Sequence, residues 1–199
     1  MWRIISIICF VSFAINSFGQ KKSEIAKITS LTCFGVDFSI VKINGADEEP
    51  EDFKKAFTAI NKLFVTENEK YTNPIIKKLK IDVPEIKIDI TSELASDIDE
   101  SFYVTNNTAQ TLDETTIAAQ LEKINPEKSE GDGIVFIAKL LNKNKDIATY
   151  EIVIFNRANN QIYSHWSSDG EAGGFGLRNY WASSVIDAMK NTKFIKEKK

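Results

Sequence analysis

GIVFIAKLLNKNKDIATYEIVIF, residues 133–155, contains two strongly apolar runs separated by a short polar segment. Residues 133–141 are nearly all apolar, which is typical of a central strand covered on both faces. Residues 147–155 are rich in β-branched and aromatic side chains and predict a second strand. The polar residues 142–146 predict the turn between them, so this segment places two strands side by side in a sheet.

A third strand is predicted after the turn at residues 157–160, where asparagine tolerates positive φ. Residues 161–168 alternate between two faces, with Ile162, Ser164 and Trp166 on one and Tyr163, His165 and Ser167 on the other. The three strands together predict an antiparallel meander.

The meander leads into SSDGEAGGFGLRNYW, residues 167–181, which holds four of the nine glycines in the chain. The apolar residues that follow recur at helical spacing and predict a final helix: Trp181, Ala182, Val185, Ile186 and Met189. Because glycine permits positive φ and close packing, the segment is expected to be the hinge that lays this helix on the sheet.

The N-terminal half alternates predicted strands and helices. Residues 25–34 favour a first strand, which either continues or bends away at Gly35. The acidic residues of 47–52 suit the positive end of a helix dipole. They introduce a helix over residues 51–65, whose apolar stripe is Phe53, Ala56, Phe57, Ile60, Leu63 and Phe64.

Asn73-Pro74 predicts the cap and first turn of a second helix, which ends before Pro84. Apolar and polar residues alternate over 86–90 and predict a half-buried strand. A Thr-x-x-Glu capping box at residues 111–114 begins a third helix. The element order β-α-α-β-α-β-β-β-α predicts an α/β (α+β) fold: a single mixed sheet of about five strands, with a C-terminal antiparallel three-strand meander and helices packed on it.

The N-terminus has the features of a signal peptide over residues 1–19. A short basic start, MWR, precedes an apolar run from Ile4 to Ile15, and SFG fits a cleavage site before Gln20. The run is shorter than the ~20 residues that span a bilayer. Residues 20–199 are therefore expected to form a single globular α/β domain that is periplasmic or secreted and does not span the membrane after cleavage.

Charge and cysteine content narrow the possible partners. Without Arg3 the mature chain has 24 basic and 28 acidic residues, a net charge of −4, which argues against nucleic-acid binding. Cys33 is the single mature cysteine, so an internal disulfide and a cysteine-based metal site are both excluded. Cys33 is expected to be a core residue, with an intermolecular disulfide as the alternative.

Motifs for cofactors and metals are incomplete. The glycines of residues 170–176 lack the Gly-Lys-Ser/Thr of a P-loop, and Asp169 and Glu171 would repel phosphate. One histidine without paired cysteines does not fit the usual zinc sites, and the acidic residues 97–100 lack the glycine of a calcium loop. No cofactor and no metal are therefore expected.

His165 is the one imidazole available as a general base, and a hydrolase would use His165 with Asp169 or a nearby serine. Neighbours on a strand face opposite sides, so Ser164 points away from His165. Ser167 shares its face but lies two residues further along. The chain has no G-x-S-x-G elbow to expose a nucleophile.

The aromatic residues around the glycine-rich segment predict a binding surface. Aromatic and arginine side chains dominate interface hot spots, and five candidates gather here: Trp166, Phe175, Arg178, Tyr180 and Trp181. Alternatively, the two tryptophans pack the last helix onto the sheet. In that case an exposed rim from Phe175 to Tyr180 remains.

GVDFS at residues 35–39 and GGFGLRNYW at residues 173–181 resemble an uncharacterised family of small secreted proteins from Bacteroidota-type bacteria. The element order resembles the α/β domains of TolB N-terminal and penicillin-binding-protein-activator proteins. These resemblances imply a cell-envelope setting and supply no catalytic residues. Unlike the activators, this chain has no lipobox cysteine.

The sequence favours an exported, non-enzymatic binding or accessory module that contacts an envelope or extracellular protein. Two alternatives remain open. One is the His165-dependent hydrolase, and the other is a small-ligand carrier with a pocket beneath the loop at residues 170–176.

Overall fold

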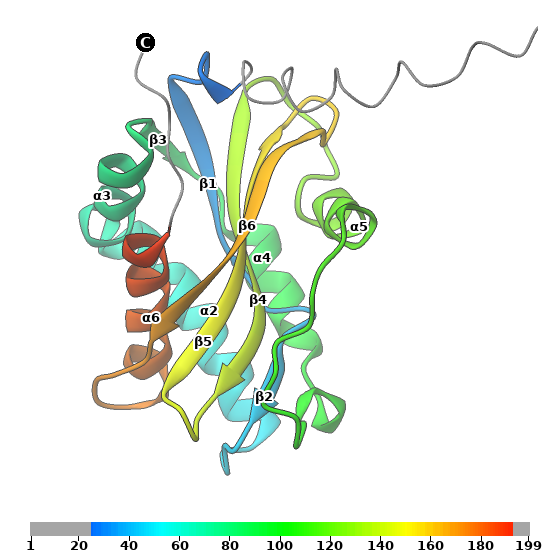
Figure 1. Cartoon of the computed structure of the whole chain (residues 1–199), viewed down its shortest axis with the longest axis vertical. Coiled ribbons are helices and arrows are strands. Elements are labelled where there is room, and N and C mark those ends of the chain that lie inside the picture. The colour runs from blue at the N-terminus through cyan, green and yellow to red at the C-terminus, as the bar shows by residue number, and fades with distance from the viewer. Residues whose placement is uncertain (1–24, 193–199) are drawn as a thin grey trace, which may run out of the picture.

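The computed structural model describes residues 25–192, which form a mixed sheet with helices on both faces (Figure 1). The strand order is β3-β1-β4-β5-β6, and β2 pairs with β4. The strands are β1 (Ser30–Asp37), β2 (Lys42–Asn44), β3 (Asp82–Ile86), β4 (Asp132–Asn142), β5 (Ile147–Asn156) and β6 (Ile162–Glu171). β1 runs parallel to β3 and β4, whereas β4, β5 and β6 form an antiparallel meander. The predicted α/β fold is confirmed, with six strands in the described part.

The helices divide between the two faces of the sheet. They are α2 (Pro50–Thr66), α3 (Asn68–Leu79), α4 (Asp89–Leu94), α5 (Glu114–Ile124) and α6 (Leu177–Asn191), with short 3-10 turns η1 (Ala95–Asp97) and η2 (Glu100–Phe102). The described residues form two apolar cores, one on each face of the sheet. Residues of α2, α3 and α6 contribute to the larger core, and residues of α5 contribute to the smaller core. Figure 1 shows α5 on the side of the sheet opposite α6.

The position of β4 inside the sheet, between β1 and β5, explains why its sequence is almost continuously apolar. Ile134 and Phe136 face the larger core under α2 and α6, while Val135 and Ile137 face the smaller core under α5. Both faces of the strand are therefore buried, as its sequence predicts. In the larger core the rings of Phe38 and Phe57 stack with their centroids 3.8 Å apart.

Strand β1 both bends and continues at Gly35. This residue has φ +67°, and the pairing of β1 with β4 shifts register between Cys33 and Val36. The buried side chain of Asn61 in α2 satisfies the irregular backbone: its Nδ2 donates to Val36 O at 2.9 Å, and its Oδ1 accepts from Val36 N at 2.8 Å. The bulge is thus held by a helix of the larger core. Cys33 is fully buried, as expected.

One prediction about proline was wrong. Pro74 lies inside α3, which begins at Asn68, rather than in its first turn. The helix ends at Leu79, before Pro84 as predicted, and Pro84 itself lies within β3. β3 pairs on one side only, with β1, so Pro84 occupies an edge strand, where a missing N–H is tolerated.

The predicted strand at residues 86–90 was also wrong, because β3 ends at Ile86 and α4 begins at Asp89. The Thr91 hydroxyl donates to Phe34 O at 2.7 Å and fastens α4 to β1. At the third predicted helix the cap is Asp113, which accepts from Thr116 N at 2.7 Å, rather than the predicted threonine of a capping box.

No helix within residues 25–192 combines the length and apolarity needed to cross a membrane. The predicted signal peptide, residues 1–19, lies outside the described residues.

Candidate functional site

The glycine-rich segment divides into strand, loop and helix. β6 extends to Glu171, residues 172–176 form the loop, and α6 begins at Leu177. Gly170 lies in the strand, where a Cβ atom would come within 1.9 Å of the Ser184 carbonyl oxygen of α6. The absence of a side chain at Gly170 therefore lets α6 lie directly on β6.

The loop is held in place by hydrogen bonds to α6. Gly173 N donates to Ser183 Oγ at 2.8 Å and to Tyr180 O at 3.0 Å. Asn179 Nδ2 donates to Phe175 O at 3.1 Å. The side chain of Phe175 at the loop tip is nevertheless 95% exposed. An aromatic ring is thus presented to solvent by a constrained backbone.

The five predicted binding residues separate into two groups. Trp181 is fully buried in the larger core, and Trp166 is half-buried with its indole N–H donating to Thr192 Oγ1. Both tryptophans therefore pack α6 against β6, which was the alternative interpretation. Phe175 and Arg178 are exposed, and Tyr180 is half-buried beside them.

Tyr180 connects the loop to the turn between β4 and β5. Its hydroxyl donates to the Asp146 carboxylate, and Lys143 Nζ lies 3.3 Å from the centroid of its ring. Burial and the Asp146 carboxylate raise the pKa of Tyr180, so the phenol stays protonated as a donor. We name the surface formed by Phe175, Arg178 and Tyr180 the loop surface.

His165 does not pair with Asp169. Its Nδ1 lies 2.7 Å from Glu151 Oε1 of β5, while Asp169 Oδ1 accepts from Thr149 Oγ1 at 2.7 Å. The catalytic pairing of His165 with Asp169 is therefore not formed. The carboxylate that holds the imidazole is Glu151, a residue that sequence reasoning missed.

Glu151 is part of a set of contacting side chains that crosses the meander, which we name the ion-pair row: Lys139, Glu151, His165 and Ser167. Its Oε2 lies 2.7 Å from Lys139 Nζ, and the same ammonium donates to Ser167 Oγ at 2.8 Å. The side chains of Lys139 and Glu151 are only 5% and 6% exposed, and that of His165 is 28% exposed. The signal in the sequence is a single charge inside each of two apolar strands.

The row has part of the geometry of a hydrolase. A carboxylate on Nδ1 leaves Nε2 of His165 as the acceptor, which is how general bases are oriented. Ser167, however, is bonded to Lys139 and not to His165. Lys139 is itself paired with the carboxylate of Glu151, so its ammonium group is already engaged.

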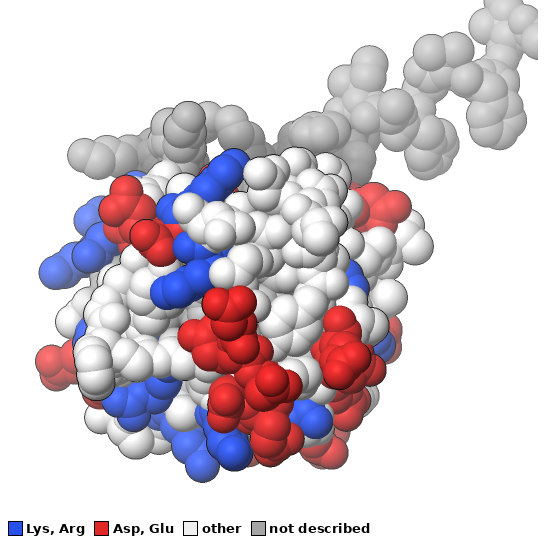
Figure 2. All heavy atoms as spheres, turned by 90° about the horizontal axis from the view of Figure 1, so that it is seen from below, with Lys and Arg blue, Asp and Glu red and all other residues white. Residues whose placement is uncertain are grey.

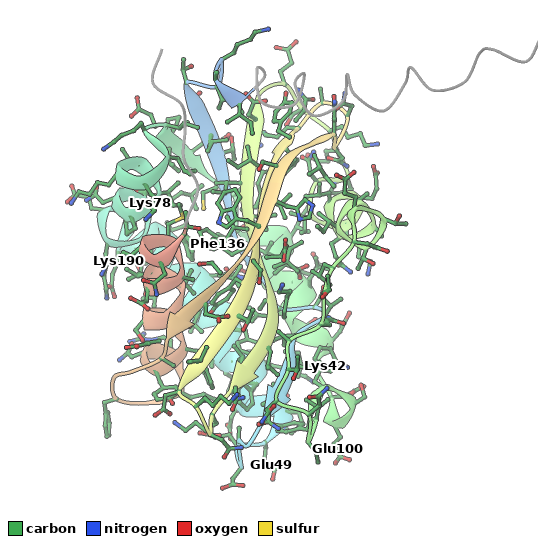
Figure 3. All side chains as sticks on the ribbon, viewed as in Figure 1. Lys42, Glu49, Lys78, Glu100, Phe136 and Lys190 are labelled. Atoms are coloured by element: carbon green, nitrogen blue, oxygen red, sulfur yellow. The ribbon has the colours of Figure 1, made fainter. Side chains whose placement is uncertain are left out.

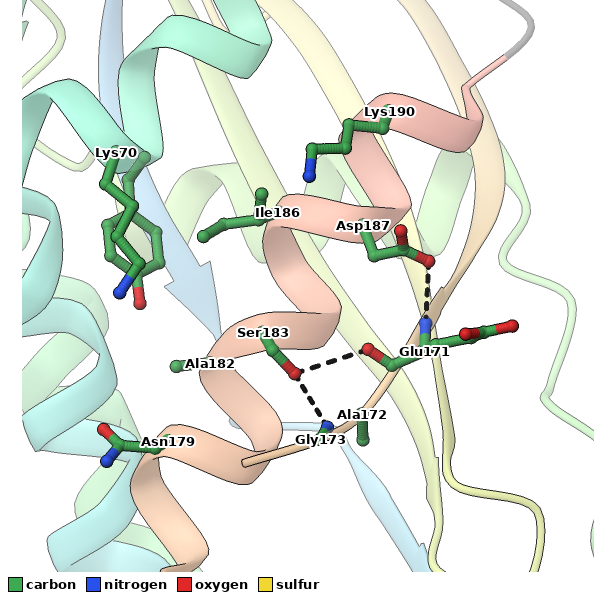
Figure 4. Close-up of a pocket in the computed structure, with 11 residues that line it drawn as sticks. Lys70, Glu171, Ala172, Gly173, Asn179, Ala182, Ser183, Ile186, Asp187 and Lys190 are labelled. Carbon is green, nitrogen blue, oxygen red and sulfur yellow. Dashed lines mark hydrogen bonds between the residues drawn. The ribbon is translucent and has the colours of Figure 1, made fainter. Parts of the chain in front are cut away.

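Two hollows lie on the other side of α6, between α6 and α3, and Figure 4 shows one of them. One of about 530 Å³ adjoins Ala172 and Gly173 and reaches Lys70 and Lys190. A second of about 530 Å³ shares Lys70, Ile186 and Lys190 with the first and extends along α3. We name the two together the α3–α6 groove. Its further lining includes Pro74, Lys77, Lys78, Ala182, Ser183 and Asp187.

Charges are distributed unevenly over the described residues. Figure 2 shows acidic side chains gathered at the lower end of the molecule, where Figure 3 places Glu49 and Glu100. Lys78 and Lys190 lie away from that end, beside each other on α3 and α6 (Figure 3). These two lysines of the α3–α6 groove are therefore separated from the acidic end.

The acidic residues 97–100 form no metal site with their neighbours. Asp99 caps η2 by accepting from Ser101 N at 2.8 Å. Within residues 25–192 no three His, Cys, Asp or Glu side chains converge as metal ligands.

Fold and site together define an α/β protein with a constrained aromatic loop, a lysine-lined groove and a buried ion-pair row. Comparison with known proteins found no matching family model, no similar curated protein and no similar solved structure.

Proposed function

We propose that this protein is a non-enzymatic binding module of the cell envelope, which contacts a partner protein through the loop surface. The observation that carries the proposal is Phe175, 95% exposed on a backbone held by Ser183 and Asn179. A single exposed apolar side chain is ordinary on its own. An exposed ring on an ordered backbone loses little conformational entropy on binding, which favours recognition.

The neighbours of Phe175 have suitable chemistry for a protein interface. The guanidinium of Arg178 is exposed, and its Nε donates to Asn179 Oδ1 at 2.9 Å. The ring of Tyr180 is fixed by Asp146 and Lys143. Arginine and tyrosine beside an exposed aromatic form a compact set of the residues that dominate hot spots.

The expected partner is an envelope or extracellular protein, because the N-terminal sequence predicts export to the periplasm or beyond. We propose this location from the sequence of residues 1–19. The α3–α6 groove begins directly beneath the loop and would enlarge the contact area.

The test is affinity capture from envelope fractions with the wild type and with Phe175→Ala/Arg178→Ala. Both side chains are exposed, so the variant is expected to fold normally and to lose most of the specifically captured protein. Lys27→Ala/Lys55→Ala, also at exposed positions, is the matched control and should retain it. Equal recovery of the same proteins by all three chains would disprove the role of the loop surface.

A second candidate, a hydrolase using His165, is favoured by the 2.7 Å contact between His165 Nδ1 and Glu151. It requires a substrate or water at Nε2, because Ser167 is held by Lys139. Turnover of a p-nitrophenyl ester that disappears in both His165→Ala and Glu151→Gln would support it. Turnover that survives His165→Ala would exclude it.

The α3–α6 groove lies where a small-ligand carrier would need its pocket. It runs between two surface helices and carries cations along its length, so it is better suited to a chain segment than to an enclosed small molecule.

A further inference from the structure

We infer that the α3–α6 groove binds an acidic segment of a partner protein, one that carries an apolar side chain among its carboxylates. The inference deepens the proposed function and rests on it. Lysines from both walls of the groove flank a short apolar floor, and this juxtaposition is the basis of the inference.

Cationic side chains come from both helices. α3 contributes Lys70, Lys77 and Lys78, and α6 contributes Lys190. Lys70 pairs with Glu67 at 2.6 Å, and Lys78 Nζ donates to the carbonyl oxygen of Lys190 at 2.7 Å. Among the residues the structure describes, neither Lys77 nor Lys190 has an ion-pair partner. Unpaired ammonium groups at a groove attract carboxylates and speed their association.

Glu69, Glu171 and Asp187 line the groove, and among the described residues none of them forms an ion pair with a groove lysine. Asp187 Oδ2 accepts from Glu171 N at 3.0 Å and from Asn191 Nδ2 at 2.8 Å, so it serves the packing of α6 on β6. Figure 4 shows the carboxylate of Glu171 pointing away from Lys70 and Lys190. The groove lining therefore holds four lysines against three carboxylates, of which Asp187 is engaged by β6 and α6 and Glu171 points away.

The floor between the lysines is apolar. Ile186 lies between Lys70 and Lys190 in Figure 4, with Ala182 one turn earlier on α6 and Pro74 opposite on α3. Lysine stems cover apolar surface while their ammonium groups stay in water. Such a surface accepts one apolar side chain and places cations around it. An acidic segment with an apolar residue has the complementary pattern.

The dimensions suit a short segment. α3 has 12 residues and is about 18 Å long at 1.5 Å per residue. An extended chain covers that length with about five or six residues. The whole chain has a net charge of −3, so the groove gathers lysines on a protein whose overall charge is slightly negative.

The chain's own C-terminal sequence does not complement the groove. Residues 193–199, KFIKEKK, contain four lysines and one glutamate. Their charge has the same sign as that of the groove lysines. The occupant is therefore expected to be another protein.

The test uses a short fluorescent peptide of glutamates with one central leucine, and fluorescence anisotropy of the chain from Gln20 onward. Lys77→Glu/Lys190→Glu is expected to weaken binding about tenfold or more, because two attractive contacts become repulsive. Lys27→Glu/Lys55→Glu makes the same charge change at exposed positions outside the groove and should alter affinity less than about twofold. Binding by the wild type should also weaken as salt is added.

Three results would overturn the inference. The glutamine version of the peptide could bind equally well, the control variant could lose as much affinity as the groove variant, or anionic phospholipid vesicles could bind the groove while the peptide does not. Failure of the proposed function gives a different pattern. In that case the peptide binds through the groove lysines, but Phe175→Ala/Arg178→Ala captures the same envelope proteins as the wild type.

Discussion

Lys139 and Glu151 are side chains whose burial makes single substitutions costly. Each is a single charge within an apolar run of its strand. Their charged atoms lie 2.7 Å apart, and their side chains are only 5% and 6% exposed. Desolvating the two charges offsets much of their attraction, so the intact pair adds little stability. Breaking the pair leaves one charge buried without its partner.

We therefore expect Lys139→Ala to lower the free energy of unfolding by about 3–5 kcal/mol. Lys139→Met/Glu151→Leu removes both charges at similar volume and should lie within about 2 kcal/mol of the wild type. Urea denaturation of the three chains measures this. Equal losses in the single and double variants would show that packing, not charge, determines the effect.

The partner of His165 could not be predicted from its sequence neighbours. Asp169 is close in sequence and shares the face of His165, but it bonds to Thr149. Glu151 reaches His165 because β5 pairs Val153 with His165 and Glu151 with Ser167. Cross-strand register determines this contact, and a shift of one residue would turn Glu151 to the opposite face. The lone charges were visible in the sequence, but their partners were not.

Asp37, at the end of β1, gives a prediction about pH. Its carboxyl is fully buried, and Oδ2 has no hydrogen-bond partner, whereas Oδ1 accepts from Ser39 N at 2.9 Å. Burial raises the pKa of Asp37 above its ordinary value of 3.8, and hydrogen bonds from Ser39 partly oppose this. At pH values between 3.8 and the folded pKa, the Asp37 carboxyl therefore keeps its proton in the folded chain and has released it in the unfolded chain. Wild-type stability must then fall as the pH rises from about 3.8 to the folded pKa.

Asp37→Asn has no proton to lose. The free energy of unfolding of the variant minus that of the wild type should rise with pH over this interval and stay constant above it. The rise is about 1.4 kcal/mol for each unit by which the pKa is raised. Urea denaturation of both chains at a series of pH values measures it. A difference that does not change with pH would contradict the raised pKa.

At the scale of elements, Gly170 controls how α6 lies on β6. A Cβ atom there would meet backbone atoms of Ser184 and Ala188 at 1.9 and 2.6 Å, so the helix would have to move. We expect Gly170→Ala to cost about 1–3 kcal/mol of stability, as overpacking does. Gly173→Ala is the matched control, because a Cβ atom at Gly173 would meet nothing within 4 Å. Thermal unfolding should separate the two, and similar melting temperatures would show that α6 can shift without loss.

The outer elements were harder to predict than the meander. β4 and β5 carry long apolar runs and α2 carries a strong helical periodicity, and all three lie close to where the sequence places them. β3 contains Pro84, which argues against a strand unless the strand is known to lie at an edge. β2 has three residues and no periodic signal, and its place depends on pairing with the far half of β4. Edge position and pairing are properties of the assembled sheet.

At the scale of the whole molecule, one sheet separates two cores of unequal size. Trp181 lies in the larger core, and Leu121 lies in the smaller core under α5. β4 and β5 have side chains in both cores, so neither core can lose its strands without disturbing the other. The described residues are therefore expected to unfold as one cooperative unit.

Leu121→Ala tests this coupling in a Trp166→Phe background that begins at Gln20, where Trp181 is the remaining tryptophan. Leu121 is fully buried, so its truncation is expected to cost about 2–5 kcal/mol. Trp181 fluorescence and far-UV circular dichroism should then shift to lower urea by the same amount, although Trp181 lies on the opposite face of the sheet. A fluorescence transition that stays in place while the dichroism splits into two steps would mean that the α5 core unfolds independently.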